Sequence, residues 1–195
     1  MAKRLFDIFF SSIGLIILSP LFLIVAVLIK LDSKGPVFFR QERVGRYFKE
    51  FRIYKFRTMS NDVSKKGPQI TVGGDTRVTK VGKVLRKYKI DELPQLINVL
   101  KGDMSFVGPR PEVRKYVEMF KSDYAKLLKV RPGITDPASI QFSAEENVLA
   151  SSNNWERDYI IKVLPEKIRL SSQYIDSQNN IITDLSLILK TIIRI

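Results

Sequence analysis

Two adjacent carboxylates, Asp91 and Glu92, stand in a part of the chain that is rich in lysine and arginine. The whole chain carries 33 basic and 20 acidic side chains, and the net charge of +13 favours an anionic partner: a phosphorylated small molecule, a nucleic acid or an acidic membrane surface. There is no cysteine and no histidine. A general base must therefore be a carboxylate, a lysine or a tyrosine, and any metal should be a hard, oxygen-bound ion such as Mg²⁺.

The residues that follow the two acids predict a helix. Proline is tolerated only in the first turn of a helix, and if Asp91 is the N-cap, Pro94 occupies the third helical position, where no hydrogen-bond donor is lost. Gly102 is a natural stop, and one apolar face is formed at helical spacing by Leu93, Leu96, Ile97 and Leu100. Both acids then lie at a helix N-terminus, which suits anions. On this pattern alone, we prefer the interpretation that Asp91 is only a helix cap and Glu92 only an acid in the first turn.

Longer motifs change that interpretation. The run Asp-Glu-Leu-Pro-Gln-Leu from Asp91, followed by Asn-Val-Leu-Lys-Gly-Asp-Met-Ser-Phe-Val-Gly-Pro-Arg-Pro-Glu, resembles the signature of the bacterial sugar transferases, the monotopic polyprenyl-phosphate phosphoglycosyl transferases. Similar motifs occur at Gly-Pro-Val-Phe-Phe-Arg-Gln-Glu-Arg-Val-Gly, Tyr-Lys-Phe-Arg-Thr-Met and Arg-Pro-Gly-Ile-Thr, so the resemblance extends over most of the chain. The chain departs from the family pattern at residues 136–140, and the resemblance therefore does not identify the sugar.

The resemblance implies an activity and a role for each site residue. The reaction would transfer a sugar-1-phosphate from a UDP-sugar to polyprenyl (undecaprenyl) phosphate and release UMP, the first membrane step of polysaccharide or glycoconjugate assembly. Asp91 would be the nucleophile that forms a covalent aspartyl phospho-sugar, and Glu92 would hold Mg²⁺. The predicted substrate-binding residues are Lys55, Arg86, Arg110 and Arg131. Arginine suits phosphate because its guanidinium binds in a bidentate manner, and Pro109 and Pro111 should keep Arg110 extended.

The N-terminal segment predicts membrane attachment. Residues 9–29 are almost wholly apolar and long enough to span a bilayer, but Ser19-Pro20 lies near the middle and should kink the helix. Basic residues flank both ends, and the positive-inside rule keeps such flanks in the cytoplasm. We therefore expect a re-entrant hairpin over residues 1–34, with a kinked straight anchor as the alternative. Residues 35–195 are expected to form a catalytic domain on the cytoplasmic face of the bacterial inner membrane.

The remaining patterns predict a mostly helical α+β fold with one small β element, near Phe51–Arg57. Thr79 should cap a helix that reaches about Tyr88, with Val81, Val84, Leu85 and Tyr88 facing inward. Further helices are expected over residues 112–130, 159–174 and 183–195; Pro165 is a candidate start for the second of these. The last is amphipathic, with Leu185, Ile188, Leu189, Ile192 and Ile193 on one face, and could lie in the membrane interface or close the core. Residues 60–74 read as a mobile loop.

Two other classes of function remain open from the residues. Interleaved aromatic and basic residues near Phe51, together with the high positive charge, fit a membrane-tethered nucleic-acid-binding module, although a basic strand beside an acidic membrane is the simpler interpretation. A purely structural membrane anchor is the third possibility. The transferase reading instead names a UDP-sugar, polyprenyl phosphate and membrane lipids as partners, without nucleic acid, and allows a homodimer. A UMP-release assay distinguishes the three readings.

Overall fold

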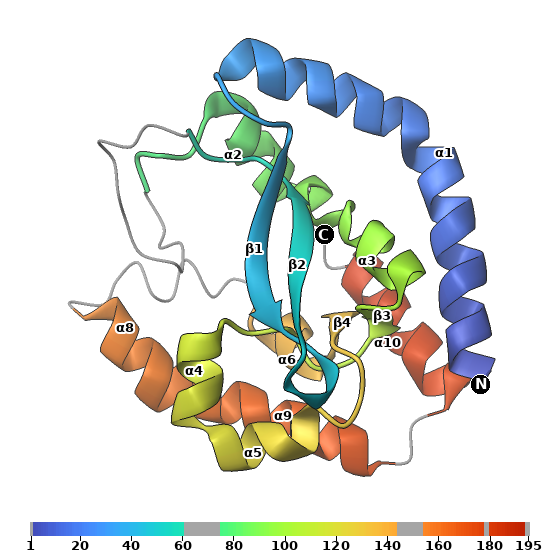
Figure 1. Ribbon diagram of the computed structural model, residues 1–195, viewed down its shortest axis with the longest axis vertical. Coiled ribbons are helices and arrows are strands. Elements are labelled where there is room, and N and C mark those ends of the chain that lie inside the picture. Colours follow the sequence, from blue (N-terminus) through green and yellow to red (C-terminus); the bar gives the residue numbers. More distant parts are fainter. Residues whose placement is uncertain (1, 61–74, 144–153, 178–179, 194–195) are drawn as a thin grey trace.

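The structure is a computed structural model that describes residues 2–60, 75–143, 154–177 and 180–193. These residues are mostly helical and contain two small two-stranded sheets, so the predicted α+β class is confirmed. The helices are α1 (Ala2–Asp32), α2 (Lys80–Lys87), α3 (Gln95–Lys101), α4 (Arg114–Met119), α5 (Lys121–Leu127), α6 (Pro137–Gln141), α8 (Trp155–Asp158), α9 (Leu164–Asp176) and α10 (Ile181–Ile193). Figure 1 shows α1 running up one side and over the top of the molecule, the β1–β2 hairpin through its middle, and α4, α5, α8 and α9 towards the bottom.

Helix α1 is long and apolar enough to cross a membrane, judged by length and composition, and only 11% of its most apolar window is buried against the protein. It continues through Pro20 as one helix, and Figure 1 shows it curving. Pro20 has no N–H to donate to the carbonyl of Ile16, and the hydroxyl of Ser19 donates to that carbonyl instead, at 2.7 Å. The carbonyl freed by the proline is thus satisfied inside an apolar stretch. The re-entrant path through a bilayer stays a prediction.

Polar side chains attach both ends of α1 to the rest of the chain. Near its start, Arg4 donates to the carbonyls of Val99 (2.6 Å) and Leu100 (2.8 Å) at the C-terminal end of α3, where a cation is favoured. The buried carboxylate of Asp7 accepts from Ser105 Oγ at 3.0 Å. At the other end, Asp32 accepts from the backbone N–H of Val81 in the first turn of α2, at 3.0 Å. These bonds place α3 and α2 against the concave side of α1.

The first sheet is an antiparallel hairpin of β1 (Phe38–Val44) and β2 (Glu50–Phe56), which confirms the predicted strand. Its turn, η1 (Arg46–Phe48), has two successive bulky residues with left-handed backbone, Tyr47 at φ 57° and Phe48 at φ 61°. This is the conformation of a type I′ turn, which normally holds Asn-Gly. Left-handed backbone is unfavourable for residues other than glycine. The guanidinium of Arg46 lies over the ring of Tyr47, 4.5 Å from its centroid, and this cation–π contact partly offsets the backbone strain.

The second sheet is a short parallel pair, β3 (Ser105–Val107) and β4 (Gly133–Thr135). Glycine is required where the two segments meet. A Cβ atom at Gly133 would lie 2.1 Å from the backbone nitrogen of Gly108, so no other residue fits there. This contact draws the Gly108-Pro109-Arg110-Pro111 segment against the Arg131-Pro132-Gly133 segment.

The largest core cluster joins α4, α5 and α9, and two helix predictions are corrected here. The helix expected over residues 112–130 is two short helices, because the backbone leaves the helical region at Phe120 (φ −121°, ψ 39°). The helix expected from Tyr159 begins earlier, with α8, and reaches α9 through a π-helical turn, η4 (Tyr159–Val163). Pro165 lies in the first turn of α9, where its missing N–H is tolerated.

The faces of two amphipathic helices are partly as expected. Thr79 caps α2 as predicted, accepting from Gly82 N at 3.0 Å, and Leu85 faces inward with Val81 packed beside it, but Val84 and Tyr88 are exposed. In α10, Leu187 is buried, whereas most of the predicted apolar face points outward: Leu185, Leu189, Ile192 and Ile193. The α10 face therefore does not close the core. The predicted loop over residues 60–74 lies outside the described residues, except for Ser60.

Candidate active site

The carboxylate of Glu92 lies where β2, α3 and the segment after β3 converge. Lys55 Nζ, from β2, donates to Glu92 Oε1 at 2.7 Å. Arg110 Nη1 donates to Oε2 at 3.2 Å, and Arg110 Nη2 also donates to Oε1. Lys55 and Arg110 are separated from Glu92 by 37 and 18 positions in the sequence, yet both contact its carboxylate. The structure therefore brings together three of the six predicted site residues around one carboxylate.

Asp91 lies beside this cluster but does not share its partners. Its side chain is buried, and among the described residues Oδ1 has no hydrogen-bond partner. Burial, together with the negative charge of Glu92, raises the pKa of Asp91 to about 6; the charges of Lys55, Arg86 and Lys89 oppose that rise. At neutral pH the carboxylate is therefore ionised but poorly stabilised, the condition in which a carboxylate is a competent nucleophile.

Glu92 has the opposite electrostatic character. Although burial alone would raise its pKa, the charges of Arg110 and Lys55 hold the pKa of Glu92 well below its usual range. Burial lowers the pKa of Lys55, and Glu92 counteracts that effect. Two neighbouring acids in one site thus have pKa values displaced in different directions, a pattern typical of functional sites.

The local backbone differs from the predicted helix N-terminus. Asp91 is not an N-cap: Ile90–Glu92 form a 3-10 turn, η3, and α3 begins only at Gln95. Lys89, in the left-handed region at φ 53°, turns the chain from α2 into η3. Gly102 ends α3 at φ 89°, as predicted. The anion-binding helix N-terminus predicted at Asp91 is therefore wrong.

The other two predicted residues lie in different places. Arg86, on α2, is close enough to Asp91 for its charge to lower the pKa of that carboxyl. Arg131 instead donates from Nε to the carbonyl of Gly102 at 2.8 Å, at the C-terminal end of α3, whereas the two acids precede the N-terminal end. A substrate-binding role for Arg131 stays a prediction, and this contact gives it no support.

A divalent ion fits the site only together with a substrate. In the part of the chain that the structure describes, no three acidic side chains are grouped so that they could hold a metal by themselves. Mg²⁺ commonly binds through one or two carboxylates plus substrate phosphates. The two carboxylate oxygens of Glu92, together with substrate phosphates, match that oxygen-rich donor set. To bind the ion as predicted, Glu92 would replace one of its contacts with Lys55 or Arg110 by a bond to the metal.

Two polar residues of α3 are fully buried, although the sequence pattern indicated only an apolar face on this helix. Gln95 is buried, and among the described residues its amide has no partner for either atom. Asn98 accepts from Tyr54 N and donates to the carbonyl of Arg52, both at 2.9 Å, and so fixes α3 on β2. Their spacing of three residues from Glu92 and from each other was the signal that could have identified them.

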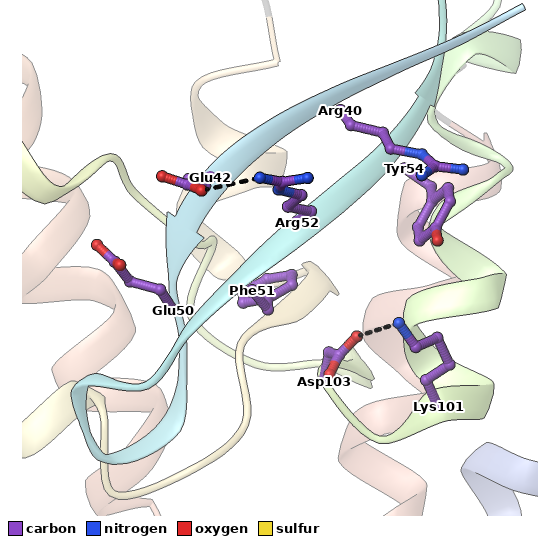
Figure 2. Close-up of a pocket in the computed structure, with 8 residues that line it drawn as sticks. All are labelled: Arg40, Glu42, Glu50, Phe51, Arg52, Tyr54, Lys101 and Asp103. Carbon is purple, nitrogen blue, oxygen red and sulfur yellow. Dashed lines mark hydrogen bonds and ion pairs between the residues drawn. The ribbon is translucent and has the colours of Figure 1, made fainter.

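A separate hollow of about 380 Å³ lies beside the hairpin and the C-terminal end of α3 (Figure 2), lined by Arg40, Glu42, Glu50, Phe51, Arg52, Tyr54, Lys101 and Asp103. Its cations have local partners: Arg40 stacks 4.7 Å from the Tyr54 ring centroid, Arg52 pairs with Glu42 at 3.5 Å, and Lys101 pairs with Asp103 at 3.6 Å. It holds none of the predicted site residues. Convergent cations and an unpartnered carboxylate occur instead at Asp91 and Glu92, which we take as the candidate active site.

Comparison with known proteins agrees with these motifs. The family model described as "Bacterial sugar transferase" matches residues 1–195. The chain belongs to this family. It is 44% identical to the "Exopolysaccharide production protein PSS" of Rhizobium leguminosarum bv. phaseoli, over 71% of the chain and 73% of the relative. It is 52% identical to the "UDP-N-acetylgalactosamine-undecaprenyl-phosphate N-acetylgalactosaminephosphotransferase" of Aeromonas hydrophila, over 71% of the chain but only 33% of the relative.

A third sugar transferase relative is the "UDP-glucose:undecaprenyl-phosphate glucose-1-phosphate transferase" of Klebsiella pneumoniae, 47% identical over 71% of the chain and 30% of the relative. The chain thus spans about a third of the length of the Aeromonas and Klebsiella proteins. The predicted family is confirmed. The names of these three relatives give no support to the alternative of a nucleic-acid-binding module.

Proposed function

We propose that this sugar transferase moves a sugar-1-phosphate from a UDP-sugar to polyprenyl (undecaprenyl) phosphate and releases UMP. The observation that carries the proposal is that two adjacent acids have different surroundings. Asp91 is buried with no hydrogen-bond partner for Oδ1 among the described residues, whereas Glu92 is bound by two cations. The relatives' names supply the substrate classes, a UDP-sugar and undecaprenyl phosphate. The net charge of +13 suits two anionic substrates.

In the first step, an oxygen of Asp91 attacks the β-phosphorus of the UDP-sugar. The new bond joins this oxygen to phosphorus, the bond between β-phosphorus and the bridging oxygen breaks, and UMP leaves with the electron pair. Lys55, Arg86 and Arg110 are the cations that would neutralise the phosphates as the carboxylate approaches. The contacts of Lys55 and Arg110 with Glu92, and the effect of Arg86 on the pKa of Asp91, support this role.

In the second step, the phosphate oxygen of the polyprenyl phosphate attacks the phosphorus of the aspartyl phospho-sugar. The bond to Asp91 breaks, and its carboxylate is regenerated, with a polyprenyl-diphosphate sugar as the product. Mg²⁺, held by Glu92 together with substrate phosphate, would supply further charge neutralisation when bound. Arg110 and Lys55 hold Glu92 ionised and ready for that role.

The membrane provides the second substrate, and the apolar surfaces suit that location. We propose that α1 enters and leaves the cytoplasmic leaflet of the bacterial inner membrane as a re-entrant helix that bends at Ser19-Pro20. The exposed apolar face of α10, with Leu185, Leu189 and Ile192, would lie in the interface. The greasy acceptor then reaches the site without leaving the bilayer.

The test measures UMP release from a panel of UDP-sugars by the full chain in detergent or nanodiscs, with Mg²⁺ and undecaprenyl phosphate. Asp91→Asn should abolish UMP release and labelling of the protein by radioactive sugar phosphate. The control Asp176→Asn, which removes an exposed carboxylate paired with Lys126 at 2.6 Å, should leave both unchanged. Substantial turnover by Asp91→Asn would exclude the nucleophile, and absence of UMP release from the wild type with every UDP-sugar would reject the function. An unchanged Mg²⁺ titration in Glu92→Gln would remove Glu92 as the ligand.

A further inference from the structure

A second carboxylate, Glu112, lies two residues after Arg110 and is almost fully buried, with 6% of its surface exposed. Tyr159 Oη donates to Glu112 Oε1 at 2.6 Å, and the backbone N–H of Val113 donates to Oε2 at 3.2 Å. Arg43 Nη1 lies 3.4 Å from Oε2, and Lys167 Nζ lies 3.8 Å from Oε1. One buried acid therefore collects donors from β1, from η4 and from α9.

The same elements hold the backbone on both sides of Arg110. Arg43 Nη1 also donates to the carbonyl of Pro111 at 3.1 Å, and the N–H of Val44 donates to the carbonyl of Glu112 at 2.9 Å. On the other side, the N–H of Gly133 donates to the carbonyl of Pro109 at 3.0 Å. The segment that carries Arg110 is thus fixed at each neighbouring residue, and Glu112 is the point at which its side-chain contacts converge.

A purely stabilising role explains this arrangement poorly. Burying an acid with two cations carries a large desolvation cost, and apolar residues of similar volume often give equal or greater stability. A buried charge network does, however, define one position for the backbone that carries it, because each displaced partner would leave a buried charge unpaired. Here that backbone is the segment whose arginine contacts Glu92.

We propose that Glu112 is a positioning residue that fixes Arg110 where its guanidinium meets Glu92 and, in the reaction, the phosphates of the donor. The second half of this inference rests on the proposed function. The network connects η4 and α9 to the two acids through one arginine, so a substitution at Tyr159 or Lys167 should alter the contact between Arg110 and Glu92.

The chain offers a matched control. Asp184, on α10, is also a buried carboxylate with a tyrosine and a lysine as partners, Tyr174 Oη at 2.5 Å and Lys3 Nζ at 2.6 Å, and these bonds do not involve the Arg110 segment. Glu112→Gln and Asp184→Asn each remove one buried charge and keep the side-chain shape. Both substitutions should lower the thermal unfolding temperature. A loss of activity that comes only from lower stability would therefore appear in both variants.

The first measurement is a double-mutant cycle on kcat/KM for UMP release. Glu112→Gln should lower kcat/KM by about tenfold or more in the wild-type background and have little effect in an Arg110→Ala background, because its action passes through Arg110. Asp184→Asn should leave kcat/KM unchanged. The inference is overturned if Glu112→Gln lowers kcat/KM by the same factor in both backgrounds. If Glu112→Gln does not fold, Tyr159→Phe, which deletes a single hydrogen bond to the same carboxylate, takes its place in the cycle.

The second measurement does not depend on activity. An experimental structure of the Glu112→Gln chain should show the guanidinium of Arg110 displaced from Glu92, whereas Asp184→Asn should retain the ion pair. An intact Arg110–Glu92 pair in Glu112→Gln overturns the inference even if the enzyme is active. Conversely, a wild type that releases no UMP rejects the proposed function while this structural comparison still decides the position of Arg110.

Discussion

Replacing the proposed nucleophile should make the folded protein more stable at neutral pH. Burial and the neighbouring charge of Glu92 raise the pKa of Asp91 from 3.8 to about 6. When folding raises the pKa of an acid, the acid does not lower the free energy of unfolding at pH values below its unfolded-state pKa, where it is protonated in both states. As the pH rises from there through the folded-state pKa, the free energy of unfolding falls progressively. At about 1.4 kcal/mol for each pH unit, the ionised carboxylate costs about 3 kcal/mol above pH 6, and Asp91→Asn removes that cost.

The assay is thermal unfolding of the wild type and Asp91→Asn in the same detergent at pH 8 and at pH 4. For a chain of this size, 3 kcal/mol corresponds to an increase in Tm of about 6–12 °C. We expect Asp91→Asn to be more stable by an amount of this order at pH 8, and the difference should be much smaller at pH 4, where the folded-state carboxyl is protonated and the pH is close to the unfolded-state pKa of 3.8. Comparing the two proteins at each pH cancels the titration of groups that do not interact with Asp91.

Glu92→Gln is the contrasting variant. Arg110 and Lys55 depress the pKa of Glu92, so its ionised form contributes stability that is present above the unfolded pKa and is lost as the pH falls through the folded pKa. This variant should therefore be less stable than the wild type at pH 8. A difference between Asp91→Asn and the wild type that is the same at pH 4 and pH 8, or a loss of stability in Asp91→Asn at pH 8, would refute the electrostatic description of the pair.

Two further predictions follow from the same residues and from the hairpin. UMP release should fall about tenfold per pH unit below pH 6 and level off above it, because only the ionised form of Asp91 attacks; a rate that is flat between pH 5 and pH 7 would contradict this. The double substitution Tyr47→Asn, Phe48→Gly should raise the free energy of unfolding by about 1–2 kcal/mol in a denaturant titration, because Asn-Gly adopts the two left-handed positions without strain; lower stability would show that the aromatic contacts outweigh the strain.

Local signals in the sequence identified the ends of several elements correctly. Thr79 caps α2, Gly102 ends α3 in the left-handed region, and the aromatic and basic run after Glu50 forms β2. Each of these signals acts through the backbone of the same few residues, so it can be read from a short window. The Gly108 and Gly133 segments were recognised as motifs, but their physical reason, a backbone approach that excludes any Cβ atom, is visible only in the fold.

The contacts that define the site depend on residues far apart in the chain. Nothing in the local pattern indicates that Lys55 reaches Glu92, or that Glu112 is a buried acid rather than a surface one; Lys55 was predicted from the family motif alone. The departure from the family pattern at residues 136–140 left the sugar unidentified. In the structure Asp136 caps α6, accepting from Ser139 N at 2.7 Å, and its other oxygen accepts from Ser171 Oγ at 2.5 Å, so this residue has a structural role that the sequence did not indicate.

The error at Asp91 has a chemical consequence. Had Asp91 been an N-cap, its oxygen would accept a backbone N–H, which stabilises the ionised form, lowers the pKa and occupies the attacking lone pair. The 3-10 turn avoids this. With about three residues per turn, neighbouring side chains diverge by roughly 120°, so Glu92 faces Lys55 and Arg110 while Asp91 faces elsewhere. The cations are therefore paired with Glu92, the proposed metal ligand, and Oδ1 of Asp91, the proposed nucleophile, is left without a hydrogen-bond partner among the described residues.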